Sequence, residues 1–196
     1  MTRYPLHNFA GLTAIVLHRS AEPMRNVVER CDRLGIHALA QTGDLDTEIA
    51  ANADMVILDI DTGHDGQLPW PAGQAPVPLI GLVSSESPGR LAWALGQGVD
   101  AYLPVSALGN LFSALVIAHE TFTRKAERSE REREVARQRA GRVDVIRAVL
   151  LLMPECGDEA LALKQLRAMA MVEQISLEDA AALLLSERQA SGAGGQ

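Results

Sequence analysis

The sequence predicts an α/β domain built on a doubly wound, parallel, five-stranded sheet, followed by a long charged helix and a small all-helical module. Three observations predict this order. Short apolar runs alternate with helical patterns over roughly the first 120 residues, which is typical of parallel strands covered by helices on both faces. A stretch rich in arginine and glutamate follows, and the remaining chain shows only helical spacing.

Five apolar runs are predicted to form the strands of the sheet. They cover residues 14–17, 36–40, 54–59, 77–83 and 99–103, and helices are predicted between them at 22–34, 46–52 and 88–97. The segment 62–78 is crowded with glycine and proline, so a helix there must be short or missing. Trp70 lies in this segment between two prolines, and it is interpreted either as a packed loop residue or as an anchor for a protein partner.

The stretch 122–142 is the most charged part of the chain. It holds eight of the 18 lysines and arginines and four acids, a local charge of +4, whereas the net charge of the chain is −7. The rest of the chain therefore carries −11, so any attraction for nucleic acid must come from this stretch or from a local patch. Arginine, glutamate and alanine favour an exposed helix, which is predicted to span 111–147.

Sparse apolar residues along this helix recur near a 3-4 repeat. Such a helix can bridge two bodies through solvent and can also pair with a second copy of itself as a coiled coil; the simpler alternative is a solvated helix. The predicted dimer contacts are Leu115, Phe122, Ala126, Ala136 and Val143.

Three short helices are predicted at the C-terminal end. The first continues the charged helix and is expected to stop at Pro154 and Gly157. Asp158 precedes the second helix, and a capping signature at Ser176 opens the third, at 177–187. Residues 191–196 are predicted to form a flexible tail.

Several classes of function are disfavoured. Cys31 and Cys156 do not suggest a disulfide framework. No secretory signal is recognised, and no apolar run approaches the roughly 20 residues of a membrane span, so a cytoplasmic protein without membrane contact is expected. The five histidines are scattered and no nucleophile grouping can be placed, so neither an enzyme nor a cofactor is predicted. His18 and His64 could both lie near Asp59, but a metal site there is disfavoured.

Residues 10–120 resemble the receiver domain of two-component regulators. Asp59 ends the third predicted strand, where that family carries its phosphate acceptor, and Ser84 follows the fourth strand, where the family has Ser or Thr. The family's acidic pair after strand one is here His18 and Arg19, and its lysine after strand five falls at Val105. The resemblance therefore implies a pseudo-receiver over 1–118, with Asp59 as a vestigial phospho-acceptor that could pair with Arg19.

The C-terminal residues resemble the ANTAR module, the RNA-binding three-helix tail of AmiR- and NasR-type transcription antiterminators, and the domain order and length resemble the AmiR type of amidase operon regulator. The resemblance places this module at 143–190. It implies a dimer that binds paired hairpins in leader mRNA and so prevents a terminator from forming. It also implies control by a ligand-sensing partner similar to periplasmic solute-binding proteins (AmiC-like) instead of phosphorylation. The matching residues are 147–153, 157–160, Leu166, Arg167, Ala170, Met171, Leu177 and Ala181.

RNA recognition requires cations for the phosphates. The candidates are Arg139, Arg142, Arg147, Lys164 and Arg167. Two positions depart from the family, which has Lys and then a small residue where this chain has Val149 and Leu150. These departures and the acidic tail leave an alternative open: a dimeric protein–protein adaptor that does not bind nucleic acid. Ala148, Met153, Leu166, Ala170 and Ala181 are expected to pack between helices.

Overall fold

The computed structural model describes residues 7–193 of the chain. The chain divides into two compact units, with the boundary between Ala126 and Glu127. The first unit is an α/β domain and the second consists of helices only.

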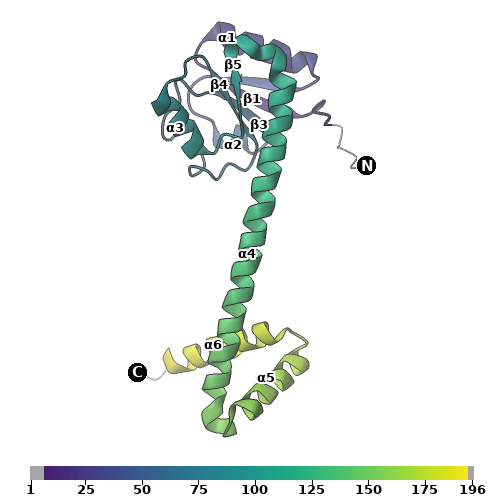
Figure 1. The fold of residues 1–196 in the computed structure, drawn as a ribbon, viewed down its shortest axis with the longest axis vertical. Helices are drawn as coiled ribbons and strands as arrows, with labels where there is room; N and C mark the ends of the chain where they lie inside the picture. Colours follow the sequence, from purple (N-terminus) through teal and green to yellow (C-terminus); the bar gives the residue numbers. More distant parts are fainter. Residues whose placement is uncertain (1–6, 194–196) are drawn as a thin grey trace. The chain divides into compact units, whose positions relative to one another are not determined.

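The α/β unit contains one sheet of five parallel strands in the order β2-β1-β3-β4-β5 (Figure 1). The order reverses direction at β1, which is the doubly wound, flavodoxin-like arrangement shared by receiver domains. The predicted fold class is therefore confirmed. The strands are β1 Thr13–Leu17, β2 His37–Gln41, β3 Met55–Asp59, β4 Leu79–Val83 and β5 Ala101–Pro104.

Helices cover both faces of the sheet because alternate residues of each strand point to opposite faces. One face packs against α1 (Ala21–Arg33) and the first turns of α4 (Leu111–Cys156). The other face packs against α2 (Thr47–Ala50), α3 (Pro88–Gln97) and the loop after β3. The first core contains Ala14, Val16, Val27, Cys31, Ile57, Ile80, Leu82, Leu111 and Leu115, and the second contains Ile15, Leu17, Val56, Leu58, Ile60, Leu68, Leu79 and Ala94.

The segment between β3 and β4 contains no helix, as the glycine and proline content predicted. Trp70 packs against the second core, which favours the interpretation as a packed loop residue. Gly63 in the same segment touches the ring of Trp93 so closely that a Cβ there would lie 2.1 Å from a ring carbon. A loop thus replaces a covering helix by placing its own apolar side chains over the sheet.

A 3₁₀ segment, Val105–Asn110, leads into α4, whose first turns belong to the core of the α/β unit. Leu115 is 2% exposed and lies in that core. The prediction that Leu115 is a dimer contact is therefore wrong, because its side chain is already covered by the sheet.

In the described part of the chain, one helical segment, Val105–Cys156, is long and apolar enough to cross a membrane by length and composition alone. Helices that pack on the core of a soluble domain have the same length and composition. Leu111, Ala114 and Ala118 of this segment are buried against the sheet, so packing in the domain accounts for their apolar character.

Beyond Ala126, the middle of α4 is exposed, and ion pairs between neighbouring residues of the same helix stabilise it. Arg131 pairs with Glu127 at 3.1 Å, and Arg137 pairs with Glu134 at 3.2 Å. Exposed pairs of this kind support a helix weakly and are screened by salt. The predicted exposed charged helix is confirmed.

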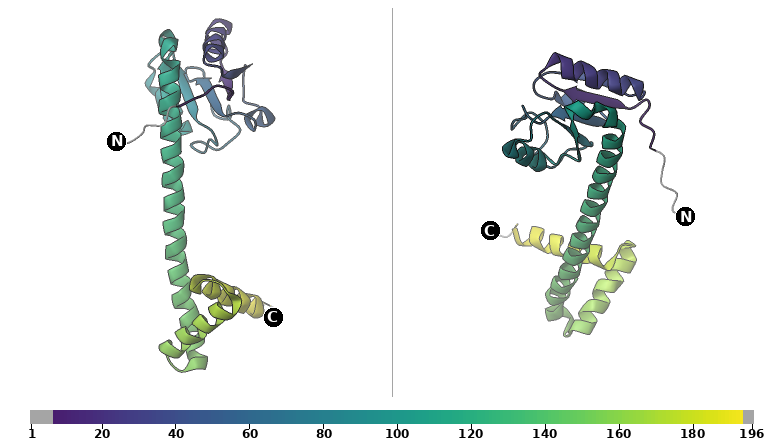
Figure 2. Two further views of the ribbon diagram at one scale, coloured as in Figure 1. Left: turned by 90° about the vertical axis from the view of Figure 1, so that its right-hand side faces the viewer. Right: turned by 45° about the horizontal axis from the view of Figure 1, so that its top comes forward.

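The second unit packs the end of α4 against α5 (Glu159–Glu173) and α6 (Leu177–Ala193) (Figure 2). The predicted packing role of Ala148, Leu166, Ala170 and Ala181 is confirmed, because all four are buried. The core consists of Ala148, Leu152, Ala162, Leu166, Ala170, Ala180, Ala181 and Leu184. Five of these eight residues are alanines, so the short helices approach one another closely.

The helix ends differ slightly from the predicted ones. Pro154 lies inside α4, which ends at Cys156. The Asp158 side chain caps α5 by accepting a hydrogen bond from the Leu161 amide at 2.7 Å, and Ser176 Oγ accepts one from the Asp179 amide at 3.0 Å. Helix α6 runs to Ala193, six residues further than predicted, so the predicted tail is helical over 191–193; residues 194–196 lie outside the described residues.

Candidate functional site

The carboxyl edge of the sheet carries Asp59 at the end of β3, the position of the phosphate acceptor in receiver domains. Asp59 is 4% exposed. Its carboxylate accepts hydrogen bonds from Thr62 Oγ1 at 2.7 Å and from the Asp61 amide at 3.1 Å. His18 Nε2 lies 4.0 Å from Asp59 Oδ2, and His18 Nδ1 accepts the Ser20 amide at 3.0 Å. The expected partner Arg19 is exposed, so the basic side chain beside Asp59 is His18, although the two make no hydrogen bond with each other.

Asp61, two residues further on, joins the loop after β3 to the loop after β4. Its carboxylate accepts hydrogen bonds from the Ser84 amide at 2.6 Å, the Ser85 amide at 3.2 Å and Ser85 Oγ at 2.5 Å. Partial burial opposes the charged form, but these hydrogen bonds and the nearby Arg90 lower the pKa of Asp61 below its usual value. We call Asp61, Ser84 and Ser85 the carboxylate clamp.

This edge lacks the donor set that receiver phosphoryl transfer uses. That chemistry requires oxygen ligands for a hard cation and a side-chain cation for the phosphate oxygens. His18 and Arg19 follow β1 in place of carboxylates, and Val105 follows β5 in place of lysine. Within residues 7–193, no three His, Cys, Asp or Glu side chains are grouped so as to hold a metal ion. The residues present at this edge therefore fit a structural role.

An ion pair between the half-exposed Lys125 and the buried Asp100 ties α4 to the sheet. Lys125 Nζ lies 2.7 Å from Asp100 Oδ1 and donates to the Gly98 carbonyl at 2.9 Å. The Asp100 side chain is 2% exposed, and its other oxygen accepts the Leu79 amide at 3.0 Å. The sequence analysis missed this pair, because the two residues are 25 positions apart and neither belongs to a motif.

The five predicted RNA contacts all lie in the helical unit and are all exposed. Arg142 lines a hollow beside the acidic start of α6, where Glu178 and Asp179 lie. Arg147 lies 3.7 Å from Asp144. Lys164 and Arg167, together with Arg139, have no ion pair among the described residues. Lys164 and Arg167 are one turn apart on α5, whereas Arg139, Arg142 and Arg147 lie on α4. The structure therefore places two of the predicted contacts on α5 and three on α4.

The remaining predicted dimer positions lie on accessible parts of α4. Ala126 and Ala136 are exposed, Val143 is 46% exposed, and Phe122 is half-buried against the α/β unit. Ile146 and Leu150, in the apolar last turns of α4, are exposed as well. Together with Ala136 and Val143 they follow a heptad spacing of the kind that forms coiled-coil seams.

No family model matches the chain, and no curated protein matches it. Among solved structures, the chain is similar to the response regulator ChrA of a heme-sensing two-component system, at 15% identity and a TM-score of 0.43, over 91% of this chain and 98% of that one. It is also similar to the signal receiver domain of a diguanylate cyclase from Desulfovibrio desulfuricans G20, at 16% identity and a TM-score of 0.45, over 58% and 98% of the two chains.

A third solved structure, the RcsB response regulator of Salmonella typhimurium, matches at 14% identity and a TM-score of 0.42, over 89% of this chain and 98% of that one. The strand order and the position of Asp59 make the first unit a receiver-like domain. The side chains at its carboxyl edge distinguish it from a receiver equipped for phosphoryl transfer.

Proposed function

We propose that this protein is a transcription antitermination regulator of the ANTAR type. In this proposal the three-helix unit binds hairpins in leader RNA, two chains pair along α4, and a ligand-sensing partner protein controls the dimer in place of phosphorylation. The observation that supports RNA binding best is the pair Lys164 and Arg167, which lie one turn apart on α5, exposed and without an acidic partner among the described residues. Cations left free in this way are suited to phosphate contacts.

The receiver-like unit supports the second part of the proposal. Its Asp59 lacks the surrounding groups of a phosphoryl site, so another signal must control the protein. A partner that binds the protein only in the absence of its own small ligand would supply such control.

A protein–protein adaptor is the second candidate function. Met171 and Val172 at the end of α5 are 80% and 79% exposed, and Leu161 at its start is 50% exposed. Exposed apolar residues of this size on one helix favour contact with another protein. This candidate predicts a stable complex with a partner and no retention of RNA.

RNA binding can be tested with the double variant Lys164→Ala, Arg167→Ala of the full chain and the hairpin-containing leader RNA of its own operon. Each lost phosphate contact lowers the slope of log K against log salt by roughly 0.7 to 0.9. The variant is therefore expected to bind more weakly and with a shallower slope, measured by filter retention or gel shift over a salt series.

The matched control is Arg25→Ala, Arg33→Ala on α1, which changes the net charge equally at exposed positions of the other unit. Its affinity should equal that of the unmodified protein. If both double variants lost RNA affinity equally, the interaction would be nonspecific charge attraction. If the unmodified protein retained no RNA at low salt in the absence of the partner, the adaptor function would be favoured.

A further inference from the structure

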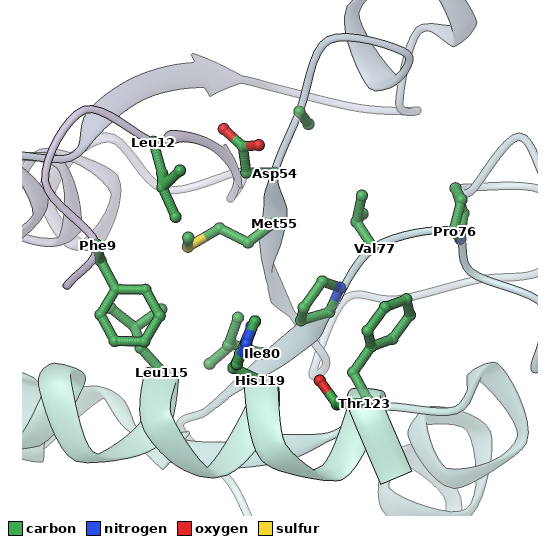
Figure 3. A pocket seen from close by; sticks show the side chains of 13 residues that line it. Phe9, Leu12, Asp54, Met55, Pro76, Val77, Ile80, Leu115, His119 and Thr123 are labelled. Atoms are coloured by element: carbon green, nitrogen blue, oxygen red, sulfur yellow. The ribbon is translucent and has the colours of Figure 1, made fainter. Parts of the chain in front are cut away.

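A cavity of about 380 Å³ lies inside the α/β unit, at the edge of the sheet opposite to Asp59. It opens between the amino ends of β3 and β4 and the first turns of α4 (Figure 3). Its volume falls in the range of small-molecule sites, roughly 300 to 1,000 Å³. The sequence analysis and the proposed function assign nothing to it.

The walls of the cavity are mainly apolar and include two aromatic rings, Phe9 and Phe122. Figure 3 shows Leu115, His119 and Thr123 pointing into the cavity from α4 and Met55 facing them from β3. His119 stands edge-on to Phe9, with ring centroids 6.3 Å apart and planes at 79°. A flat aromatic group fits walls of this kind, because rings pack well edge-to-face and against methionine.

One charged side chain, Asp54, lies among the residues that line the cavity. Its Oδ2 accepts the Thr13 amide at 2.8 Å, which fixes the carboxylate beside the start of β1. Asp54 has no cationic partner among the described residues, in contrast to Asp100, which pairs with Lys125. The α/β part of the chain also has thirteen acids against six bases over 1–123, so the net charge of this part favours the approach of a cation.

We propose that this cavity binds a small aromatic amine, a molecule with one or two fused aromatic rings and a protonated amino group. The ring packs among Phe9, Met55 and Phe122, and the ammonium group interacts with Asp54. This inference goes beyond the proposed function and does not depend on RNA binding.

Such a ligand would contact the sheet and α4 simultaneously. Leu115, His119, Phe122 and Thr123 lie on one side of α4, spaced by one and two turns, and the opposite wall comes from β3 and the segment before β4. A molecule that binds only the folded arrangement raises its stability by mass action. Ligand binding would therefore hold the last core-contacting turns of α4 on the sheet.

The test uses NMR titration of the ¹³C-methionine-labelled full chain with tryptamine, a two-ring aromatic amine, and with indole-3-acetate, which has the same ring and the opposite charge. Saturable shifts of the Met55 methyl are expected with tryptamine, and binding at least threefold weaker is expected with indole-3-acetate. The variant Asp54→Asn keeps an acceptor for the Thr13 amide and should remove most of this preference.

Thr123→Trp places a bulky ring at the cavity and should abolish the titration, whereas Arg124→Trp, on the neighbouring exposed position, should leave it unchanged. The inference is overturned if the Met55 methyl does not respond to tryptamine in a folded protein. It is also overturned if tryptamine and indole-3-acetate bind with equal affinity. A Met55 methyl signal that shifts when the protein is diluted, but not when tryptamine is added, would overturn it as well, because the cavity would then be occupied by a second copy of the chain. None of these readouts involves RNA, so they are separable from a failure of the proposed function.

Discussion

Two aspartates at the carboxyl edge of the sheet illustrate how neighbouring residues differ in environment. Asp59 is buried, with Thr62 and His18 as its side-chain neighbours. Asp61 is less buried and collects three donors from the loop after β4. Asp59 occupies the phosphate-acceptor position of a receiver, yet Asp61 makes the contacts that join two loops at this edge.

Asp59 is expected to resist phosphorylation. Incubation of the full chain with acetyl phosphate and Mg²⁺ should leave its intact mass unchanged, because no second carboxylate after β1 and no lysine after β5 assist the transfer. A competent receiver domain in the same incubation is the control for the reagent. A phosphoryl adduct that disappears in Asp59→Asn would contradict this expectation.

The carboxylate clamp is expected to make stability depend on acid pH. The folded pKa of Asp61 is lowered, so its contribution is complete above the unfolded pKa of about 3.9 and is lost as the pH falls through the folded pKa. Asp61→Ala should therefore cost about 1–2 kcal/mol at pH 7, and the difference from the unmodified protein should shrink below pH 4. Urea unfolding followed by tryptophan fluorescence measures this, because Trp70 and Trp93 both lie in the α/β unit.

The control for this experiment is Glu86→Gln, an exposed change in the loop that follows the clamp. Its stability should follow the unmodified protein at every pH. A constant difference for Asp61→Ala between pH 7 and pH 3 would show that the clamp does not act through the carboxylate charge.

At the scale of one element, α4 changes character along its length. Its first turns bury Leu111, Leu115 and Ala118 in the sheet core, whereas its middle is exposed and has ion pairs along its own surface. Lys125, next to the unit boundary, pairs with Asp100 at the start of β5. This ion pair therefore marks the point at which α4 changes from core packing to an exposed helix.

Lys125→Met is expected to destabilise the α/β unit by about 1–3 kcal/mol. It leaves the buried Asp100 carboxylate without its cation; the cost stays below that of a fully buried pair because Lys125 is half exposed. The midpoint of urea unfolding followed by tryptophan fluorescence should fall accordingly. Arg124→Met removes an exposed pair with Glu120 and should change the midpoint little. Equal effects of the two substitutions would contradict a special role for Asp100.

At the scale of the whole molecule, the proposed dimer depends on a seam of exposed apolar residues along α4. Ala136, Val143, Ile146 and Leu150 occur at alternating spacings of seven, three and four residues. Large side chains exposed at such spacings are suited to knobs-into-holes packing with a second helix.

Val143→Asp is expected to shift the protein from dimer to monomer and to abolish antitermination. A carboxylate in an apolar seam is buried without a partner, which opposes association. Sedimentation equilibrium of the full chain measures the change. Gln138→Asp, at an exposed position on a different side of α4, is the matched control and should remain dimeric. Full antitermination by a monomeric variant would be incompatible with the proposal.

Many local features were predictable from the sequence. The five apolar runs predicted the strands within two residues at either end, because a buried parallel strand needs a continuous apolar run. The cap residues Asp158 and Ser176 predicted the starts of α5 and α6 for a similarly local reason. At the candidate site, the residue types were predictable from the sequence. His18, Arg19 and Val105 stand where phosphoryl transfer requires carboxylates and a lysine, and this replacement does not depend on how the side chains pack.

Contacts between residues that are distant along the chain could be identified only in the tertiary structure. The structure shows that Leu115 is a core residue and that Asp59 lies beside His18 and not Arg19. It also decided that Asp100 pairs with Lys125 and that a cavity remains between β3, β4 and α4. The physical reason is that periodicity depends on neighbouring residues, whereas a side chain's partner depends on how the crossovers bring separate elements together.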